Sequence, residues 1–402
     1  MFTRSLVIAD YRADCIYAVQ GTQVTLINSG VLAEHAGIIG LPHHMGSATP
    51  WAYVDDKRGT LVLHTDNKTE PTHIPVAIPS EHIASDPTGQ YIAATSGLGA
   101  NFEPWSDIVT IADTKSGESV RFRTRVGEPG VVITTDRTTR EPILVLRHRE
   151  PGAIEAIPLA EALAVGPHVP VLTGKTTTDI ADDGHGDVVD QETGIVATAT
   201  SRGLERFIVE NGQPRALPTI AWPVPGRAFY LRFDPNTHSA LGIVRGGPAN
   251  PQAWTDWTNH LVEIDLNTGE TRHVALPNGL AFRFAFGGNR VAVASIHPDG
   301  DQLTLLQRDT TTLAVTQRIP LPSMSNPPTP GHLPWDPVGD SPAQRRAVAV
   351  DPTGETVAVT RGGDSQIHLI TQRGMDTLTL PTPLHEGGVL FWTGGPNDPV
   401  GR

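Results

Sequence analysis

Residues Val350–Gly363 read VDPTGETVAVTRGG, and residues Ser85–Leu98 read SDPTGQYIAATSGL. Both stretches place an Asp-Pro-Thr-Gly turn directly before a strand of alternating apolar residues. Proline presets φ at the second position of a β-turn, and glycine relieves crowding at the fourth. An apolar segment also precedes each turn. The two stretches therefore predict β-hairpins that are built in the same way.

Weaker copies of this hairpin occur elsewhere in the chain. Turn signals follow strand-like segments at six further positions: Asp10–Asp14, Asp55–Gly59, Asp136, Asp190, Asp234 and Gly287. A second hairpin, with the pattern Asp-x-x-[Ser/Thr]-Gly-Glu, recurs at Asp113–Glu118 and Asp265–Glu270. Because the two hairpins alternate along the chain, we predict a repeating unit of four strands, a to d, with tight a–b and c–d turns.

The spacing of the turns indicates the fold. Most a–b turns lie roughly 45–55 residues apart, which is the period of a β-propeller blade. We predict an all-β protein in which residues 1–402 form a single β-propeller domain of four-stranded antiparallel blades. The turn at Asp55 precedes Asp86 by only 31 residues, so seven blades are favoured, with eight as the alternative. The segment HEGGVLFW (His385–Trp392) is expected to complete the N-terminal blade, closing the ring by pairing strands from the two chain ends.

At HIASDPTG (His82–Gly89) and AVAVDPTGETVAVT (Ala347–Thr360) the chain resembles the seven-bladed propellers with YVTN-type repeats and the related lactonase-like propellers. The resemblance extends over most of the chain as a repeat pattern. It implies the fold alone, because such turns recur in propellers of unrelated function. No motif beyond the turn matches, so no catalytic residue is transferred from these families.

Composition excludes several functions. A net charge of −13 argues against nucleic acid as a partner, since phosphate binding needs a basic surface. No phosphate-binding loop or dinucleotide motif is present, so no nucleotide cofactor is expected. The N-terminal segment has too short an apolar run for a signal peptide or a membrane span, which predicts a cytoplasmic protein without membrane contact. A closed ring has few free sheet edges and favours a monomer.

Two tryptophans mark the face on which we expect the chemistry. In a four-stranded blade the b–c loops and d–a connections share one face of the ring, and here they hold most of the unusual residues. Trp105 and Trp254 lie in long b–c loops, Ser96–Asp107 and Arg245–His260. They are predicted to form the walls of a pocket, or alternatively to hold each loop against a neighbouring blade.

Basic residues end several predicted b strands. Arg147, Arg202, Arg245 and Arg361 are the candidates for substrate binding. A ring of guanidinium groups would bind a carboxylate or phosphate, because arginine contacts such groups in a bidentate manner. The alternative is that these arginines pair with Asp or Glu between blades.

Histidines recur at the predicted d–a connections. They lie at His43-His44, His82, His185, His332 and His385. His82, His185 and His385 are the candidate ligands of one divalent metal ion, because neutral imidazoles suit such ions. His185 and Asp187, in ADDGHGD (Ala181–Asp187), are the candidates for proton transfer. The alternative is that each histidine only forms hydrogen bonds within its loop.

The segment Pro320–Gln344 contains eight prolines and joins two predicted blades. Proline restricts φ and removes a backbone donor, so an extended segment is expected. It is predicted to be a lid over the channel mouth or a strap packed on the ring.

These features favour an enzyme that acts on a small, anionic organic molecule at the channel mouth, by hydrolase, lactonase or lyase chemistry with metal assistance. The alternative is a non-catalytic scaffold that binds a protein or carbohydrate through the Trp- and Arg-rich face. The sequence leaves open whether the protein is a catalyst, and it does not identify the substrate or the metal.

Overall fold

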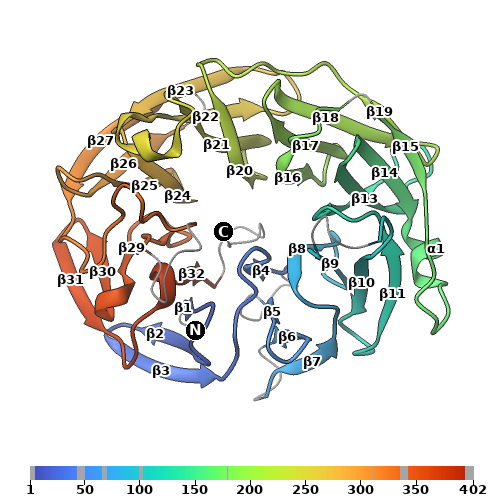
Figure 1. The fold of residues 1–402 in the computed structure, drawn as a ribbon, viewed down its shortest axis with the longest axis horizontal. Coiled ribbons are helices and arrows are strands. Elements are labelled where there is room, and N and C mark those ends of the chain that lie inside the picture. The colour runs from blue at the N-terminus through green and yellow to red at the C-terminus, as the bar shows by residue number, and fades with distance from the viewer. Residues whose placement is uncertain are drawn as a thin grey trace.

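The structure is a computed structural model that describes residues 5–42, 50–65, 70–98, 103–178, 180–309, 311–335 and 343–393. Within these ranges the chain forms eight four-stranded antiparallel sheets arranged around a central axis (Figure 1). The predicted all-β propeller of four-stranded blades is thus confirmed. The favoured count of seven blades is wrong, and the alternative count of eight is correct.

The first four blades are numbered here in chain order, with strands given from the axis outward. Blade 1 contains β32 (Val389–Trp392), β1 (Leu6–Ala9), β2 (Ile16–Gln20) and β3 (Gln23–Asn28). Blade 2 contains β4 (Ile38–Gly40), β5 (Trp51–Asp55), β6 (Thr60–His64) and β7 (Thr72–Pro75). Blade 3 contains β8 (Ser80–Ser85), β9 (Tyr91–Ser96), β10 (Asp107–Asp113) and β11 (Ser119–Thr124). Blade 4 contains β12 (Gly130–Thr135), β13 (Pro142–Arg149), β14 (Gly152–Pro158) and β15 (Lys175–Thr177).

The other four blades follow the same order. Blade 5 contains β16 (His185–Asp190), β17 (Ile195–Thr200), β18 (Gly203–Glu210) and β19 (Gln213–Ala216). Blade 6 contains β20 (Arg227–Asp234), β21 (Ser239–Gly246), β22 (Thr258–Asp265) and β23 (Thr271–Leu276). Blade 7 contains β24 (Leu280–Gly287), β25 (Arg290–Ile296), β26 (Gln302–Arg308) and β27 (Leu313–Pro320). Blade 8 contains β28 (Val348–Val350), β29 (Val357–Arg361), β30 (Gln366–Thr371) and β31 (Gly374–Thr379).

Helices are short and lie in the connections. They are α1 (Leu159–Leu163) and the 3₁₀ segments η1 (Pro251–Asp256), η2 (Gly362–Asp364) and η3 (His385–Gly387). No helix among the described residues has both the length and the apolar character needed to span a membrane.

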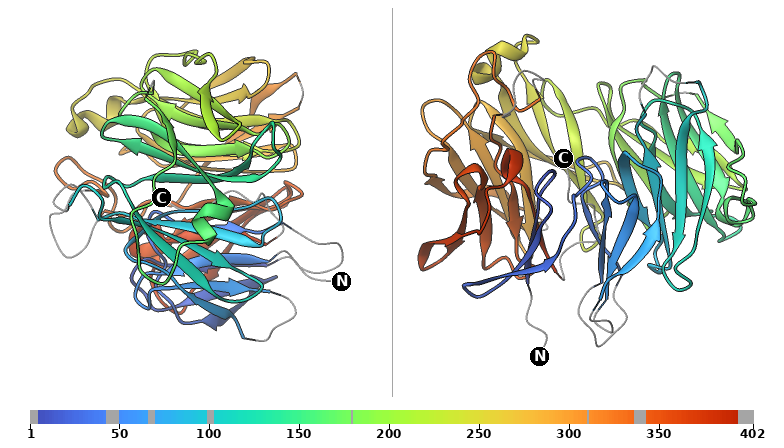
Figure 2. Two further views of the ribbon diagram at one scale, coloured as in Figure 1. Left: turned by 90° about the vertical axis from the view of Figure 1, so that its right-hand side faces the viewer. Right: turned by 60° about the horizontal axis from the view of Figure 1, so that its bottom comes forward.

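The ring closes by pairing of the two chain ends, as the sequence predicted. In the β1–β32 ladder Leu6 lies opposite Trp392 and Ala9 lies opposite Val389. Phe391 and Val389 are buried in one cluster with Trp51 of blade 2. Figure 2 shows the dark blue N-terminal strands beside the red strands of blade 8.

The repeated turn is explained by its aspartate. The Asp86 carboxylate accepts hydrogen bonds from the backbone N–H groups of Thr88, at 3.0 Å, and Tyr91, at 2.7 Å. Asp351 does the same for Glu355, at 2.8 Å. These donors lie in the turn, where no strand partner is available, so the carboxylate satisfies them locally. The same requirement in each blade favours the same turn.

The error in the blade count comes from this shared turn chemistry. The turns at Asp10 and Asp55 join the second strand of a blade to the third, in β1–β2 and β5–β6, and not the first strand to the second. Asp10 nevertheless accepts from the backbone N–H of Arg12 at 2.7 Å, and Asp55 from that of Lys57 at 3.0 Å. Because the local hydrogen bonds are alike, the sequence pattern does not distinguish a–b from b–c turns.

The described part of the proline-rich segment is packed on the ring. Met324 and Leu333 are buried in a cluster with Trp254 and Trp257 of the η1 loop. The Arg361 side chain also donates to the carbonyl oxygen of Ser323, at 2.6 Å. Residues 321–335 therefore connect blades 6, 7 and 8 as a strap, and residues 336–342 of the predicted lid lie outside the described residues.

The closing strand provides the first prediction. Phe391→Ala should lower the free energy of unfolding by about 3–5 kcal/mol, because it leaves a cavity at a side chain only 2% exposed. The matched control is Leu26→Ala on β3, at a side chain 58% exposed, which should change stability by less than about 0.5 kcal/mol. Urea unfolding, followed by tryptophan fluorescence, measures the free energy of unfolding of both variants. Equal losses in the two variants would contradict the prediction that packing of Phe391 at the closure stabilises the ring.

Candidate active site

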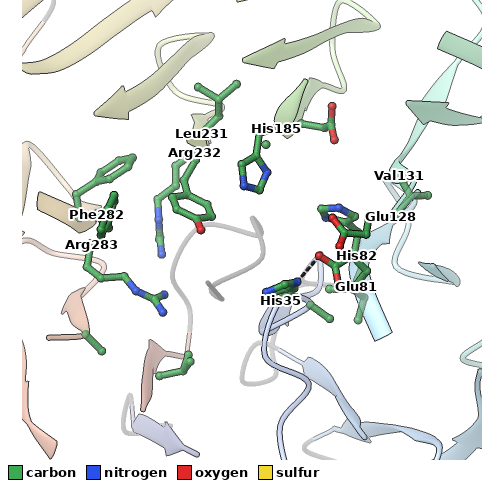
Figure 3. A pocket seen from close by; sticks show the side chains of 18 of the residues that line it. His35, Glu81, His82, Glu128, Val131, His185, Leu231, Arg232, Phe282 and Arg283 are labelled. Carbon is green, nitrogen blue, oxygen red and sulfur yellow. Dashed lines mark hydrogen bonds and ion pairs between the residues drawn. The ribbon is translucent and has the colours of Figure 1, made fainter. Parts of the chain in front are cut away.

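A cavity of about 360 Å³ opens at one mouth of the central channel, on the face of the b–c loops and d–a connections (Figure 3). It is called the channel cavity here. Strands of seven blades and the connection from blade 1 to blade 2, at His35 and Ala36, contribute to its lining. Residues far apart in sequence thus share one site.

β-Bulges select the side chains that line the channel cavity. The register shifts in four of the innermost strands. The shift lies between Ser80 and His82 in β8 and between His185 and Asp187 in β16. It lies between Ala228 and Leu231 in β20 and between Leu280 and Arg283 in β24. A bulge adds a residue to one strand and redirects neighbouring side chains. Runs such as Glu81–Ile83 and His185–Asp187 consequently line the cavity. At Gly186, where φ is +70°, an added Cβ would lie 2.7 Å from the Phe229 carbonyl oxygen.

One side of the cavity, called the His–Glu wall, consists of His35, Glu81, His82, Glu128 and His185 (Figure 3). The Nδ1 atom of His35 contacts the Glu81 carboxylate. The Nε2 atom of His82 is buried and has no hydrogen-bond partner. Burial lowers the pKa of His82 to about 3, and the charge of Arg147 acts in the same direction. The His82 imidazole is therefore neutral at pH 7.

His185 is also kept neutral. Burial lowers its pKa to about 2, aided by the charges of Arg149 and Arg147. Its ring stands edge-on to Phe229, with centroids 5.8 Å apart. Arg149 donates to Glu128, with 2.6 Å between Nη1 and Oε2, so this lining carboxylate is already paired. A neutral imidazole in this position is suited to accept a hydrogen bond or to bind a metal ion.

The other side, called the Arg–aromatic wall, consists of Tyr230, Arg232, Phe282, Arg283 and Phe284. The two walls meet where the Tyr230 ring lies 5.4 Å from that of His185, measured between centroids. Arg232 and Arg283 extend into the cavity toward the His–Glu wall (Figure 3). Arg283 Nη2 donates to the Tyr11 hydroxyl at 3.0 Å. The Arg232 guanidinium lies 5.8 Å from the ring centroid of Phe284. The cavity therefore has a cationic side and a side of imidazoles and carboxylates.

Asp187 lies deeper, against Arg147. The Arg147 Nε donates to both carboxylate oxygens, at 2.9 and 3.0 Å. Burial opposes ionisation, but the charge of Arg147 outweighs it and holds the pKa of Asp187 below its usual value. Asp187 also lines a second cavity, of about 340 Å³, toward the Asp-Pro-Thr-Gly turns. The Arg147–Asp187 pair thus stands between the two halves of the channel.

The four arginines predicted to form an anion-binding ring do not gather in the channel cavity. Arg147 is committed to Asp187, and Arg202 pairs with Glu205, with 2.5 Å between Nη2 and Oε1. Arg361 pairs with Asp364, with 3.2 Å between Nε and Oδ2, and binds the proline-rich strap. The Arg147–Asp187 pair joins two blades, as the alternative expected, whereas the pairs of Arg202 and Arg361 lie within their own blades. Arg245 lies among aromatic rings at the rim of the face, in a separate cavity described below.

The two predicted tryptophan walls also differ from the expectation. Trp254 is fully buried under the strap, at 0% exposure, so it is not a pocket wall or a stacking surface for a sugar. Trp105 lies 5.9 Å from the guanidinium of Arg125, measured to the ring centroid, and does not line the channel cavity. Trp254 fits the alternative in which a tryptophan holds its loop against a neighbouring blade, whereas the contact of Trp105 lies within its own blade.

The three predicted metal ligands are not all together. His82 and His185 line the channel cavity, whereas His385 lies beside Asp10 and Glu386 in another depression. Among the residues that the structure describes, no group of three His, Cys, Asp or Glu side chains is arranged to hold a metal ion. His43 and His44 lie outside the described residues.

Sequence reasoning missed much of the site: His35, Glu81, Glu128, Arg149, Arg232 and Arg283. A signal was present for some of them. Glu81, Arg232 and Arg283 lie in the first strand of a repeat, just before its turn, and this strand is the innermost in a propeller. A charged residue on the first strand of a repeat is therefore a better indicator of the channel lining than a charged residue at the end of the second strand.

No model of a protein family matches the chain, and no curated protein matches it significantly. Solved structures do match. Apo AztD from Citrobacter koseri is 13% identical, with a TM-score of 0.60, over 98% of this chain and 99% of that one. Dihydro-heme d1 dehydrogenase NirN, in complex with DHE, is 10% identical, with a TM-score of 0.59, over 97% of this chain and 75% of that one.

A third match is a functionally unknown protein from Desulfotomaculum acetoxidans, 12% identical, with a TM-score of 0.54, over 98% of this chain and 99% of that one. At these identities the likeness shows the fold alone. The chain is an eight-bladed β-propeller. The expected resemblance implied the fold alone, and the β-propeller fold is confirmed.

The buried pair at the channel centre provides the second prediction. Asp187→Asn should lower the free energy of unfolding by about 3–5 kcal/mol, because it leaves the Arg147 charge buried without a counter-ion. The matched control is Asp183→Asn, which breaks a partly exposed pair with Arg227 and should cost about 0–1 kcal/mol. Urea unfolding measures both. A small loss for Asp187→Asn would show that Asp187 is free for another role, such as the predicted proton transfer.

Proposed function

We propose that this protein is an enzyme that acts on a small organic anion in the channel cavity, and that its reaction is hydrolysis of a lactone or ester. The observation that carries the proposal is the opposition of an imidazole–carboxylate pair and two guanidinium groups across one cavity of about 360 Å³. That volume lies within the range of small-molecule sites.

The Arg–aromatic wall is the proposed binding side. Each acidic side chain of the cavity has a basic partner: Glu81 contacts His35, Glu128 contacts Arg149, and Asp187 contacts Arg147. Glu128 and Asp187 are thus balanced by arginines, Glu81 contacts an imidazole, and Arg232 and Arg283 add positive charge on the other side. A carboxylate on the substrate would be attracted to these guanidinium groups and could bind them through charge-assisted hydrogen bonds.

The His35–Glu81 pair is the proposed base. Glu81 contacts Nδ1 of His35, an arrangement that orients an imidazole so that its Nε2 can accept a proton. A water molecule attacks the substrate carbonyl carbon and transfers a proton to His35 Nε2. The acyl C–O bond then breaks, and His35 returns the proton to the leaving alkoxide. The products are the hydroxy acid, or an acid and an alcohol, with no other reactant needed.

His82 and His185 are the residues that would hold a divalent metal ion. The buried, unpartnered Nε2 of His82 and the neutral state of both imidazoles fit a ligand role. A metal there would polarise the substrate carbonyl. Since the described residues provide no third ligand in place, water or substrate would have to complete the coordination.

Turnover tests the proposed reaction. Lactones and esters that carry a carboxylate should be hydrolysed, as measured with a pH indicator, with and without added divalent metal. His35→Gln should lower kcat by about 10²–10⁴-fold by removing the base, and Arg283→Gln should raise KM by about 10- to 100-fold by removing a charged hydrogen bond. The control is His297→Gln, at a rim residue outside the cavity. Absence of turnover across the panel, or equal rates in all variants, would refute the proposal.

Metal content tests the proposed cofactor separately. Protein prepared without a histidine tag, incubated with Zn²⁺, Ni²⁺ or Cu²⁺ and desalted, should retain one ion per chain by elemental mass spectrometry. His82→Gln and His185→Gln should each lose that ion, because two imidazoles are needed to hold it. His385→Gln is the matched control and should retain it. If only His385→Gln loses the ion, the metal site lies beside Glu386 and not in the channel cavity.

A further inference from the structure

A second cavity on the same face lies beside the channel cavity and has a different character. It has a volume of about 500 Å³ and is called the rim cavity. Its lining includes Arg227, Arg245, Trp257 and Trp335, and it shares no lining residue with the channel cavity. It lies between blades 5 and 6 and the end of the proline-rich strap.

Arg245 is held in place there by aromatic rings. Its guanidinium carbon is 4.0 Å from the Trp257 ring centroid and 4.4 Å from the Phe229 ring centroid. Trp257 is itself fixed, because its Nε1 donates to the Pro248 carbonyl oxygen at 2.9 Å and its ring stacks on Trp335 at 6.0 Å. Contacts to ring faces restrain a guanidinium but leave its N–H donors unused.

The N–H donors of Arg245 are not otherwise occupied. Among the described residues, its side chain makes no hydrogen bond or ion pair, unlike Arg147, Arg202 and Arg361. The neighbouring Arg227 is paired with Asp183, with 2.7 Å between Nη1 and Oδ2. Among the described residues no carboxylate side chain lines the rim cavity, so this part of its lining carries a net positive charge.

Burial, with the charge of Arg227, lowers the pKa of Arg245 to about 10. The guanidinium is still charged at neutral pH, and among the described residues no carboxylate lines the cavity beside it. A partly desolvated cation without a counter-ion is stabilised when an anion binds. Partial burial of the guanidinium distinguishes Arg245 from the exposed arginines of the surface.

The remaining walls indicate the kind of anion. Pro248, Pro251 and Trp335 present apolar surfaces beside Arg245. Flat apolar walls favour a planar ring, and a guanidinium fork matches the two oxygens of a carboxylate. We propose that the rim cavity is a binding site for an aromatic carboxylate, with Arg245 as its anion anchor. This site goes beyond the proposed function, because it needs neither turnover nor the residues of the channel cavity.

Isothermal titration of the full chain with benzoate tests this site without a catalytic readout. Benzoate should bind at least tenfold more tightly than acetate, which lacks the ring, and more tightly than benzyl alcohol, which lacks the charge. Arg245→Met should weaken benzoate binding at least tenfold. The matched control Arg215→Met removes an exposed arginine that pairs with Glu210, and it should bind benzoate as the unchanged protein does.

Two further variants keep the test decisive. Arg245→Lys retains the charge but not the bidentate fork, and it should weaken benzoate binding even if Arg245→Met proves unfolded by circular dichroism. Arg283→Gln alters only the channel cavity and should leave benzoate binding unchanged. The proposal is overturned if benzoate does not bind, if both Arg245 variants bind it normally, or if only Arg283→Gln loses it. The last result would place the ligand in the channel cavity.

Discussion

The antiparallel pairing of β1 with β32 is the interaction on which the rest of this structure depends. It joins residues from the two ends of the chain, Leu6 with Trp392, and turns a row of blades into a closed ring. Closure fixes the innermost strands around one axis, so that their bulged ends meet. Without it, His35 and Glu81 on one side and Arg232 and Arg283 on the other would have no common cavity.

Within that ring, electrostatic balance separates structural charges from those available to a ligand. Deep in the channel, Arg147 and Asp187 neutralise each other. At the mouth, burial keeps His82 and His185 neutral, and the lining carboxylates have basic partners. Arg232 and Arg283 also line the cavity and bring positive charge to it. On an acidic protein with a net charge of −13, this local reversal of sign would concentrate a small anion at the face that carries both cavities.

The predictions from sequence were correct where a feature depends on residues close together in the chain, and wrong where it depends on contacts between distant segments. The Asp86 and Asp351 turns were recognised because a carboxylate that satisfies its own turn leaves a short, regular pattern. The same chemistry at Asp55, in a b–c position, suggested a wrong spacing and a wrong blade count. Arg361 ends its strand as expected, whereas Arg202 lies in the turn after β17. Each has an acidic partner three residues further along the chain.

The sequence by itself determined the all-β class, the four-stranded repeat and the closure by HEGGVLFW, because turns and strand alternation depend on neighbours close in the chain. It also placed His82 and His185 on the correct face. Only the tertiary structure decided the number of blades, the burial of Trp254, the isolation of His385 and the meeting of His35, Glu81, Arg232 and Arg283. The physical reason is that these depend on where each strand lies around the axis and where its bulge turns the side chains, and both are set by contacts between blades.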